Sequence, residues 1–165
     1  MSDDPDTQPD LRMLDAETFA ALRDLAAANL EAFEVTVLSP QRTLAEKLAF
    51  LHHRATEDQP EVVRKGARHL YDVAMILRHE ETCLVLDEVP MSELMVDVDA
   101  RSEAAGWGYT PRPDGGFATS VAFTGTGEVG TALRQGYADV SELAWGETPT
   151  FDQALEVVHE RAHRI

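Results

Sequence analysis

The chain has 165 residues, of which 30 are acidic and 14 are lysine or arginine, so its formal net charge is −16. This excess of negative charge opposes broad binding to nucleic acid or to a membrane surface, because both carry negative phosphates. The sequence has no apolar run of membrane-spanning length and no apolar signal region. We therefore expect a cytoplasmic protein with no membrane partner.

The N-terminal part is expected to contain a tail, a helix and a short strand. Residues 1–10 are polar, acidic and rich in proline, which predicts a disordered tail. Residues 11–165 are expected to form a single, mostly helical domain. Apolar residues at helical spacing predict a helix over 16–30, and alternation between Val35 and Val37 predicts a strand over 34–38.

A local basic cluster lies between residues 39 and 77, which hold both lysines of the chain, Lys47 and Lys65. Ser39 followed by Pro40 is typical of a helix start, because a hydroxyl can cap free amides and proline needs no partner at the first position. Thr43 with Glu46 is an alternative start, as a capping box. Either start leads into a buried stripe at helical spacing, formed by Leu44, Leu48 and Leu51.

A second helix is expected from about Glu61 to Leu77, with a break near Gly66. Beyond it, the pattern predicts a helix from residue 90 or 92 to 105, a loop over 106–116 and a strand over 117–123. Helices are then expected over 128–144 and 150–164, the last capped by Thr150. The predicted fold class is mainly α, with one or two short strands.

The two basic-cluster helices carry groups that should meet if they pack antiparallel. Lys47 lies on the margin of the leucine stripe, and Asp72 shares one side of the second helix with Arg68. A buried aspartate needs a positive partner or hydrogen bonds, so we predict that Lys47 approaches Asp72 with Arg68 nearby. Two interpretations remain open: a structural ion-pair cluster, or a cation that holds a phosphate while a carboxylate orients it.

The motifs of this stretch resemble a known family. Ser-Pro-Gln-Arg-Thr at 39–43, Glu-Lys-Leu at 46–48 and Arg-His-Leu-Tyr-Asp-Val at 68–73 are similar to the second half of AbiEii/AbiGii-type nucleotidyltransferases. These are toxins of bacterial abortive-infection and toxin–antitoxin pairs, with a "PERT…EKL" segment at a helix start and an "RHYYDL"-like segment in the next helix. Residues 132–137 and 146–151 are similar to the family's last tyrosine-bearing helix and "G…PSF" turn. The resemblance spans about Val35 to the C-terminus.

The resemblance implies the helical lobe of a nucleotidyltransferase-like fold. It also implies a family activity, the transfer of nucleotides from nucleoside triphosphate (NTP) to an RNA such as tRNA with magnesium. Lys47 and Asp72 match the family's catalytic positions, and Arg42, Lys47 and Arg68 match positions that bind the nucleotide. The implied partners are an antitoxin protein and RNA, the latter through a local basic pocket, in a phage-defence setting.

One family motif has no counterpart before Ser39, where the sequence contains no glycine. It is a Gly-Ser or Gly-Gly turn followed by an Asp-x-Asp pair that holds metal. Transfer by two metal ions needs clustered carboxylates, so we expect this chain alone not to transfer nucleotides. The alternative function is a non-catalytic binding module of a toxin–antitoxin or phage-defence system.

Three other motif matches have plainer interpretations. Gly125–Gly130 fits a dinucleotide-binding pattern but lacks the second strand, which favours a glycine-rich turn. Asp97 and Asp99 resemble a metal-binding pair, but residues two apart on a helix diverge by about 200°. His159–His163 fits a zinc-peptidase pattern without a downstream third ligand, so we expect no zinc and set aside a zinc hydrolase.

Overall fold

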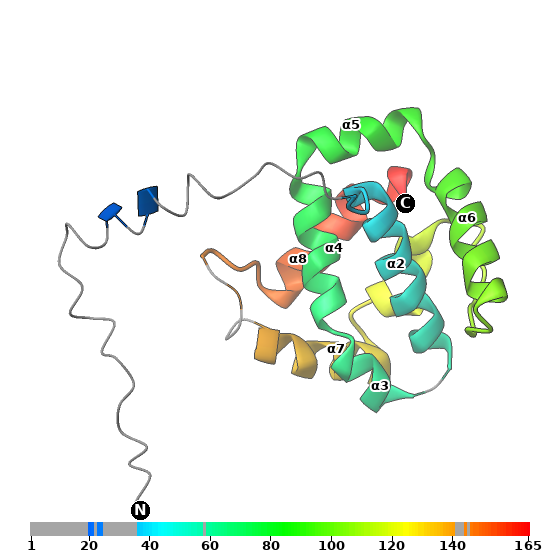
Figure 1. Ribbon diagram of the computed structural model, residues 1–165. Coiled ribbons are helices and arrows are strands. Elements are labelled where there is room, and N and C mark those ends of the chain that lie inside the picture. The colour runs from blue at the N-terminus through cyan, green and yellow to red at the C-terminus, as the bar shows by residue number, and fades with distance from the viewer. Residues whose placement is uncertain (1–19, 22, 25–35, 58, 141–143, 145) are drawn as a thin grey trace, which may run out of the picture. The chain divides into compact units, whose positions relative to one another are not determined.

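The computed structural model describes residues 20–21, 23–24, 36–57, 59–140, 144 and 146–165 (Figure 1). The chain divides into two units, Met1–Val37 and Leu38–Ile165. In the first unit the described residues at 20–24 are helical, and Arg23 pairs with Asp24 at 2.9 Å. The predicted tail over 1–10 and the rest of the predicted helix over 16–30 lie outside the described residues.

The second unit is built from helices, which confirms the mainly α fold class. Within the described ranges no residue is in a strand. The elements in chain order are α2 (Pro40–Thr56), α3 (Pro60–Lys65), α4 (Arg68–Arg78), α5 (Glu80–Glu88), α6 (Met91–Ala104), η2 (Phe117–Thr119), η3 (Val121–Phe123), α7 (Gly127–Val140), α8 (Phe151–Glu160) and η4 (Ala162–Arg164).

The predicted helix starts are confirmed where the local chemistry is strong. Ser39 caps α2, since its Oγ accepts a hydrogen bond from the Arg42 amide at 3.1 Å, and Pro40 follows at the first position. Thr150 caps α8 in a reciprocal capping box with Gln153. These side chains satisfy amides that the helices themselves leave free.

Both strand predictions were wrong as far as the structure describes them. Residues 36–38 have no regular structure, while Glu34 and Val35 lie outside the described residues. Residues 117–123 form the 3₁₀ helices η2 and η3, in which the amides of Ser120 and Phe123 bond to carbonyls three residues earlier, each at 2.9 Å. No strand lies beside this segment among the described residues, so most of its backbone bonds are local, while the Phe117 amide bonds to the main-chain oxygen of Ile165.

The short helix α5 was not predicted from the sequence, where the polar run His79-Glu80-Glu81 separates it from the preceding helical pattern. His79 does separate α4 from α5, and the two glutamates occupy the first turn of α5. Acidic side chains are favourable there because the free amides of a helix start carry partial positive charge. The break and the new helix start therefore fall on the same residues.

Helix α2 is central to the second unit, with α4 packed along one side and α6 along another (Figure 1). Helix α4 also contacts α8, and α3 packs against α7. The predicted stripe of Leu44, Leu48 and Leu51 is buried, as are Leu70, Val73, Ala74 and Leu77 of α4. This packing sets the relative position of the two helices that carry Lys47 and Asp72. No described helix is long and apolar enough to cross a membrane.

Tyr137 connects α7 to the turn that precedes α8. Its hydroxyl donates a hydrogen bond to the carbonyl of Pro149 at 3.0 Å, and its ring packs edge-on against Phe151. Burial raises the pKa of Tyr137 to about 12, so the phenol remains a donor. The tyrosine and the Gly-Glu-Thr-Pro-Thr-Phe segment at 146–151, noted separately in the sequence, are thus one structural unit.

His52 links α2 to the loop before η2. Its Nδ1 lies 2.8 Å from Ser120 Oγ and its Nε2 lies 3.2 Å from the carbonyl oxygen of Pro111. A carbonyl only accepts, so Nε2 carries a proton. Burial holds the pKa of His52 below 6.5, with a smaller contribution from His53, so at neutral pH the imidazole is neutral and Nδ1 accepts from the Ser120 hydroxyl.

We expect acid to destabilise the fold through His52. The unfolded chain binds a proton at pH values where the folded chain does not, so the free energy of unfolding falls as pH drops below about 6.5 and stops falling below the folded pKa. Urea unfolding of the wild type and of His52→Gln between pH 5 and 8 measures this contribution, since glutamine does not titrate. Parallel pH profiles for the two proteins would contradict the assignment.

Candidate functional site

Lys47 and Asp72 meet between α2 and α4, as predicted. Lys47 Nζ donates a hydrogen bond to Asp72 Oδ2 at 2.6 Å. The Lys47 side chain is 21% exposed and that of Asp72 is 38% exposed. The pair is therefore held by the packing of two helices while part of it still faces solvent.

His69 lies beside the Lys47–Asp72 pair, a contact that the sequence analysis did not predict. Its Nδ1 lies 3.3 Å from Lys47 Nζ and 3.9 Å from Asp72 Oδ2. Its ring packs edge-on against Phe50, with the ring centroids 4.7 Å apart. His69 precedes Asp72 by three residues, so one helical turn of α4 brings both side chains to the same side. That spacing was the signal that could have identified it.

Burial is the main cause that lowers the pKa of His69, and the positive charges of Lys47 and Arg68 lower it further. The negative charge of Asp72 raises the pKa of His69, but by less. At neutral pH the imidazole is therefore neutral, and its Nδ1 can accept a hydrogen bond from the Lys47 ammonium. The Asp72 carboxylate and the neutral His69 imidazole together hold the Lys47 ammonium in place.

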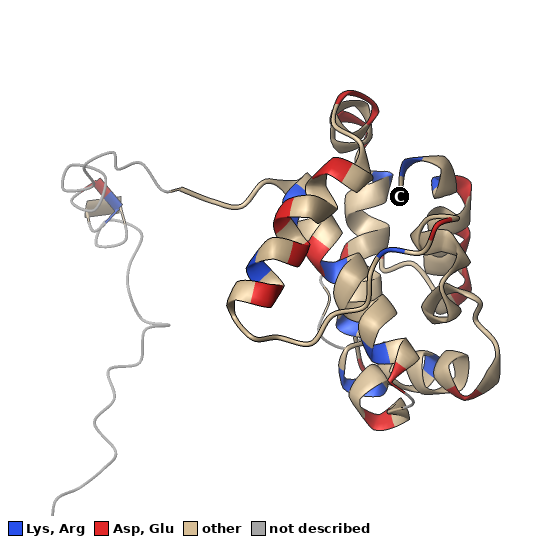
Figure 2. Ribbon diagram, turned by 90° about the vertical axis from the view of Figure 1, so that its right-hand side faces the viewer, with Lys and Arg blue, Asp and Glu red and all other residues tan. Residues whose placement is uncertain are grey.

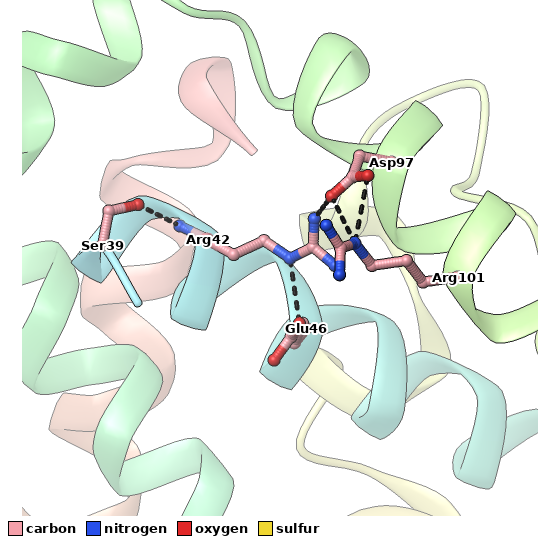
Figure 3. A network of polar contacts seen from close by, with 5 residues as sticks. All are labelled: Ser39, Arg42, Glu46, Asp97 and Arg101. Atoms are coloured by element: carbon pink, nitrogen blue, oxygen red, sulfur yellow. Dashed lines mark hydrogen bonds and ion pairs between the residues drawn. The ribbon is translucent and has the colours of Figure 1, made fainter. Parts of the chain in front are cut away.

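Arg68 and Arg42 are placed differently from Lys47. Arg68 is exposed at the start of α4, where its charge acts on the neighbouring His69. Arg42 points from α2 toward α6 (Figure 3), where its guanidinium pairs with Asp97 and its Nε donates to Glu46 at 2.9 Å. Its side chain is only 14% exposed. The structure thus joins Lys47 to Asp72. The catalytic roles of these two residues and the nucleotide-binding roles of Arg42, Lys47 and Arg68 stay predictions.

Asp97 and Asp99 have separate surroundings on α6. Asp97 is shared by Arg42 and Arg101, whose Nε donates to it at 3.0 and 3.1 Å (Figure 3). Asp99 is partly buried, its Oδ1 has no hydrogen-bond partner among the described residues, and burial raises its pKa. Asp97 therefore lies on a solvated face of α6, whereas Asp99 is partly buried.

The described residues do not fit a magnesium ion. Among them, no three His, Cys, Asp or Glu side chains gather closely enough to hold a metal. Asp72 is bound by Lys47 and Asp97 by two arginines, so neither carboxylate is turned toward another. We therefore derive no step through a metal ion at this site.

Residues of the other two motifs have structural roles. Gly125 and Gly127 adopt φ values of 70° and 68°, which favour glycine, at the turn into α7. His159 Nε2 lies 2.9 Å from the carbonyl oxygen of Phe123, so it donates a hydrogen bond that links α8 to η3. The absence of zinc stays a prediction.

The comparison with protein families agrees with the motif resemblance. A family model described as "Nucleotidyl transferase AbiEii toxin, Type IV TA system" matches residues 4–157. The chain belongs to this family. The match begins well before Val35, where the motif resemblance started, so it includes the N-terminal segment that the motifs left out. No curated protein and no solved structure matches the chain.

Membership of the AbiEii family gives the Lys47 cluster a chemical context. A nucleotidyltransferase handles nucleoside triphosphates, whose phosphates are recognised by fixed cations and amide donors. Elsewhere in the second unit, lysine and arginine residues are scattered among acidic residues and do not gather on one broad surface in the view of Figure 2. This pattern favours local pairing over a broad basic face.

Proposed function

We propose that the second unit is the nucleotide-contacting helical lobe of an AbiEii-type nucleotidyltransferase toxin, with Lys47 as the cation that meets a phosphate group. The observation that carries the proposal is the 2.6 Å bond between Lys47 and Asp72 at a site that is still partly exposed. Asp72 and His69 orient the ammonium, which lowers the conformational entropy lost when a phosphate binds. An RNA substrate and an antitoxin partner are part of this proposal through the family.

The site is suited to binding and does not by itself supply transfer. One ammonium is a single point charge, whereas phosphoryl-type transfer neutralises charge spread over several oxygens. Asp72 stabilises the position of Lys47 in this proposal and is not assigned as a base. The chain alone is therefore expected to bind NTP weakly and to transfer nothing.

The test is titration calorimetry with the four NTPs, each with and without magnesium. Lys47→Met should weaken binding about tenfold or more, because a hydrogen bond to a charged group contributes about 1.5–3 kcal/mol. Lys65→Met is the matched control, since Lys65 is exposed at the end of α3 and the variant changes the net charge equally. Equal losses in the two variants would contradict a site at Lys47.

His69 provides an independent readout in the same experiment. The charge of Lys47 lowers the pKa of His69, so Lys47→Met should raise it, and a bound phosphate should raise it in the wild type. Both shifts are measurable by NMR titration of the imidazole signal. Lys65→Met should leave that signal unchanged.

A non-catalytic binding module is the second candidate. It is favoured by the pairing of Asp72 and Asp97 with cations rather than with each other. NTP binding that weakens in Lys47→Met but not in Lys65→Met supports the nucleotide-contacting lobe, whereas no NTP binding at all would support a module that binds only a partner. Incubation with labelled NTP, magnesium and bulk tRNA tests transfer itself: both candidates predict no label on RNA, and label that vanishes in Lys47→Met and in Asp72→Ala would contradict both and establish transfer by this chain.

A further inference from the structure

A separate hollow of about 280 Å³ lies beside the C-terminal 3₁₀ helix η4, between α5 and the start of α6. None of Lys47, His69 and Asp72 lines it. Three basic side chains do: Arg112 from the loop before η2, and His163 and Arg164 from η4. In a chain with a net charge of −16, three basic groups around one hollow call for an explanation.

Two guanidinium donors of the arginines at this hollow have no acceptor among the described residues. Arg164 donates to the Asp87 carboxylate through Nε at 2.8 Å and Nη2 at 2.9 Å, and Arg112 Nη2 donates to the main-chain oxygen of Ile165 at 2.9 Å. The remaining nitrogens Arg164 Nη1 and Arg112 Nε are buried and lack a partner among the described residues. Buried donors of charged groups are unfavourable when unpaired, so an acceptor that reaches these two nitrogens would stabilise both arginines.

The start of α6 adds further donors. Met91 and Ser92 line the hollow, and they are the first two residues of this 14-residue helix. The preceding residue, Pro90, makes no side-chain cap, so the first amides of α6 are not capped by it. Uncapped amides at a helix start carry partial positive charge and favour an anion. Ser92 also brings an exposed hydroxyl.

We propose that this hollow binds a phosphate group. The donors come from three segments, η4, the loop at Arg112 and the start of α6, and a tetrahedral phosphate has enough oxygens to accept from all three. A carboxylate has two oxygens in one plane and could not. Asp87 offsets one of the two arginine charges, and the second arginine supplies the remaining attraction.

The experiment is an NMR titration of the full chain with inorganic phosphate at constant ionic strength, with chloride as the reference anion. The Nε–H signals of Arg112 and Arg164 report on the hollow. We expect both signals to shift with a dissociation constant of about 1 mM. No shift at these two signals, or an equal shift with chloride, would overturn the proposal.

A charge placed at the mouth of the hollow tests its location. Ser92→Glu keeps α6 stable, because an acidic residue is favourable in the first helical turn, and its carboxylate competes with phosphate. It should weaken phosphate binding about tenfold or more. Ala100→Glu adds the same charge at an exposed position further along α6 and should leave binding nearly unchanged. Equal weakening by both variants would show a general charge effect and sink the proposal.

Titrations with AMP and with adenosine show whether the hollow recognises a free phosphate or the phosphate group of a nucleotide. Equal shifts with phosphate and AMP, and none with adenosine, would show that a phosphate group is recognised whatever carries it. Stronger binding of AMP than of phosphate would identify a nucleotide as the source. Shifts with adenosine but not with phosphate would contradict the proposal.

Discussion

Replacing Gly136 by alanine is expected to lower the free energy of unfolding by about 3 kcal/mol. Gly136 lies in α7 where that helix crosses α3. A Cβ built there would lie 2.9 Å from Ala67 Cβ and still closer to the carbonyl oxygen of Arg64. That oxygen belongs to the backbone, so no side-chain rotation can make room and α3 must move away from α7.

The clash outweighs the usual advantage of alanine. In a helix interior alanine is favoured over glycine by about 1 kcal/mol, which is included in the expected net loss. The Arg64 carbonyl also accepts a hydrogen bond from the Ala67 amide at 3.2 Å, directly before α4. Displacing it therefore disturbs the start of the helix that carries His69 and Asp72.

Urea unfolding monitored by circular dichroism measures this effect, with Gln135→Ala as the control. Gln135 is the exposed neighbour in the same helix, so its replacement should change stability by less than about 0.5 kcal/mol. Gly136→Ala with a stability equal to that of the wild type would show that α3 and α7 do not approach so closely.

Replacing Phe117 by alanine is expected to cost about 3–5 kcal/mol, because it leaves a cavity in the core as well as losing buried apolar surface. Phe117 is fully buried. Its ring packs edge-on against His52 with the centroids 5.9 Å apart, and the Arg112 guanidinium carbon lies 6.0 Å from the centroid. Its amide donates to the main-chain oxygen of Ile165 at 3.1 Å.

Phe117→Leu is the matched variant, since it keeps most of the buried volume and should cost less than about 1.5 kcal/mol. Urea unfolding of both variants, with the denaturant slope checked for each, separates loss of stability from a change in the unfolded state. A loss below about 1 kcal/mol for Phe117→Ala would mean that the surrounding residues collapse into the space.

The helix starts and the buried faces were predictable from the sequence because they depend on neighbours in the chain. The Ser39 side chain caps an amide three residues away. The Thr150 side chain likewise accepts from the Gln153 amide, and the Gln153 side chain accepts from the Thr150 amide. The leucine stripe of α2 follows from helical periodicity alone. The pairing of Lys47 with Asp72 was predictable because two adjacent amphipathic helices leave few ways to pack.

The tertiary structure alone decided the contacts between segments distant in sequence. Residues 117–123 have the apolar composition of a strand, but in the part of the chain that the structure describes no second strand lies beside them, and local 3₁₀ bonds form instead. Arg42 matched a nucleotide-binding position, yet α6 brings Asp97 against it. The phosphate hollow unites Arg112 with Arg164 only because η4 folds back to α5 and α6. Such contacts depend on where each helix packs, and a local pattern carries no information about that.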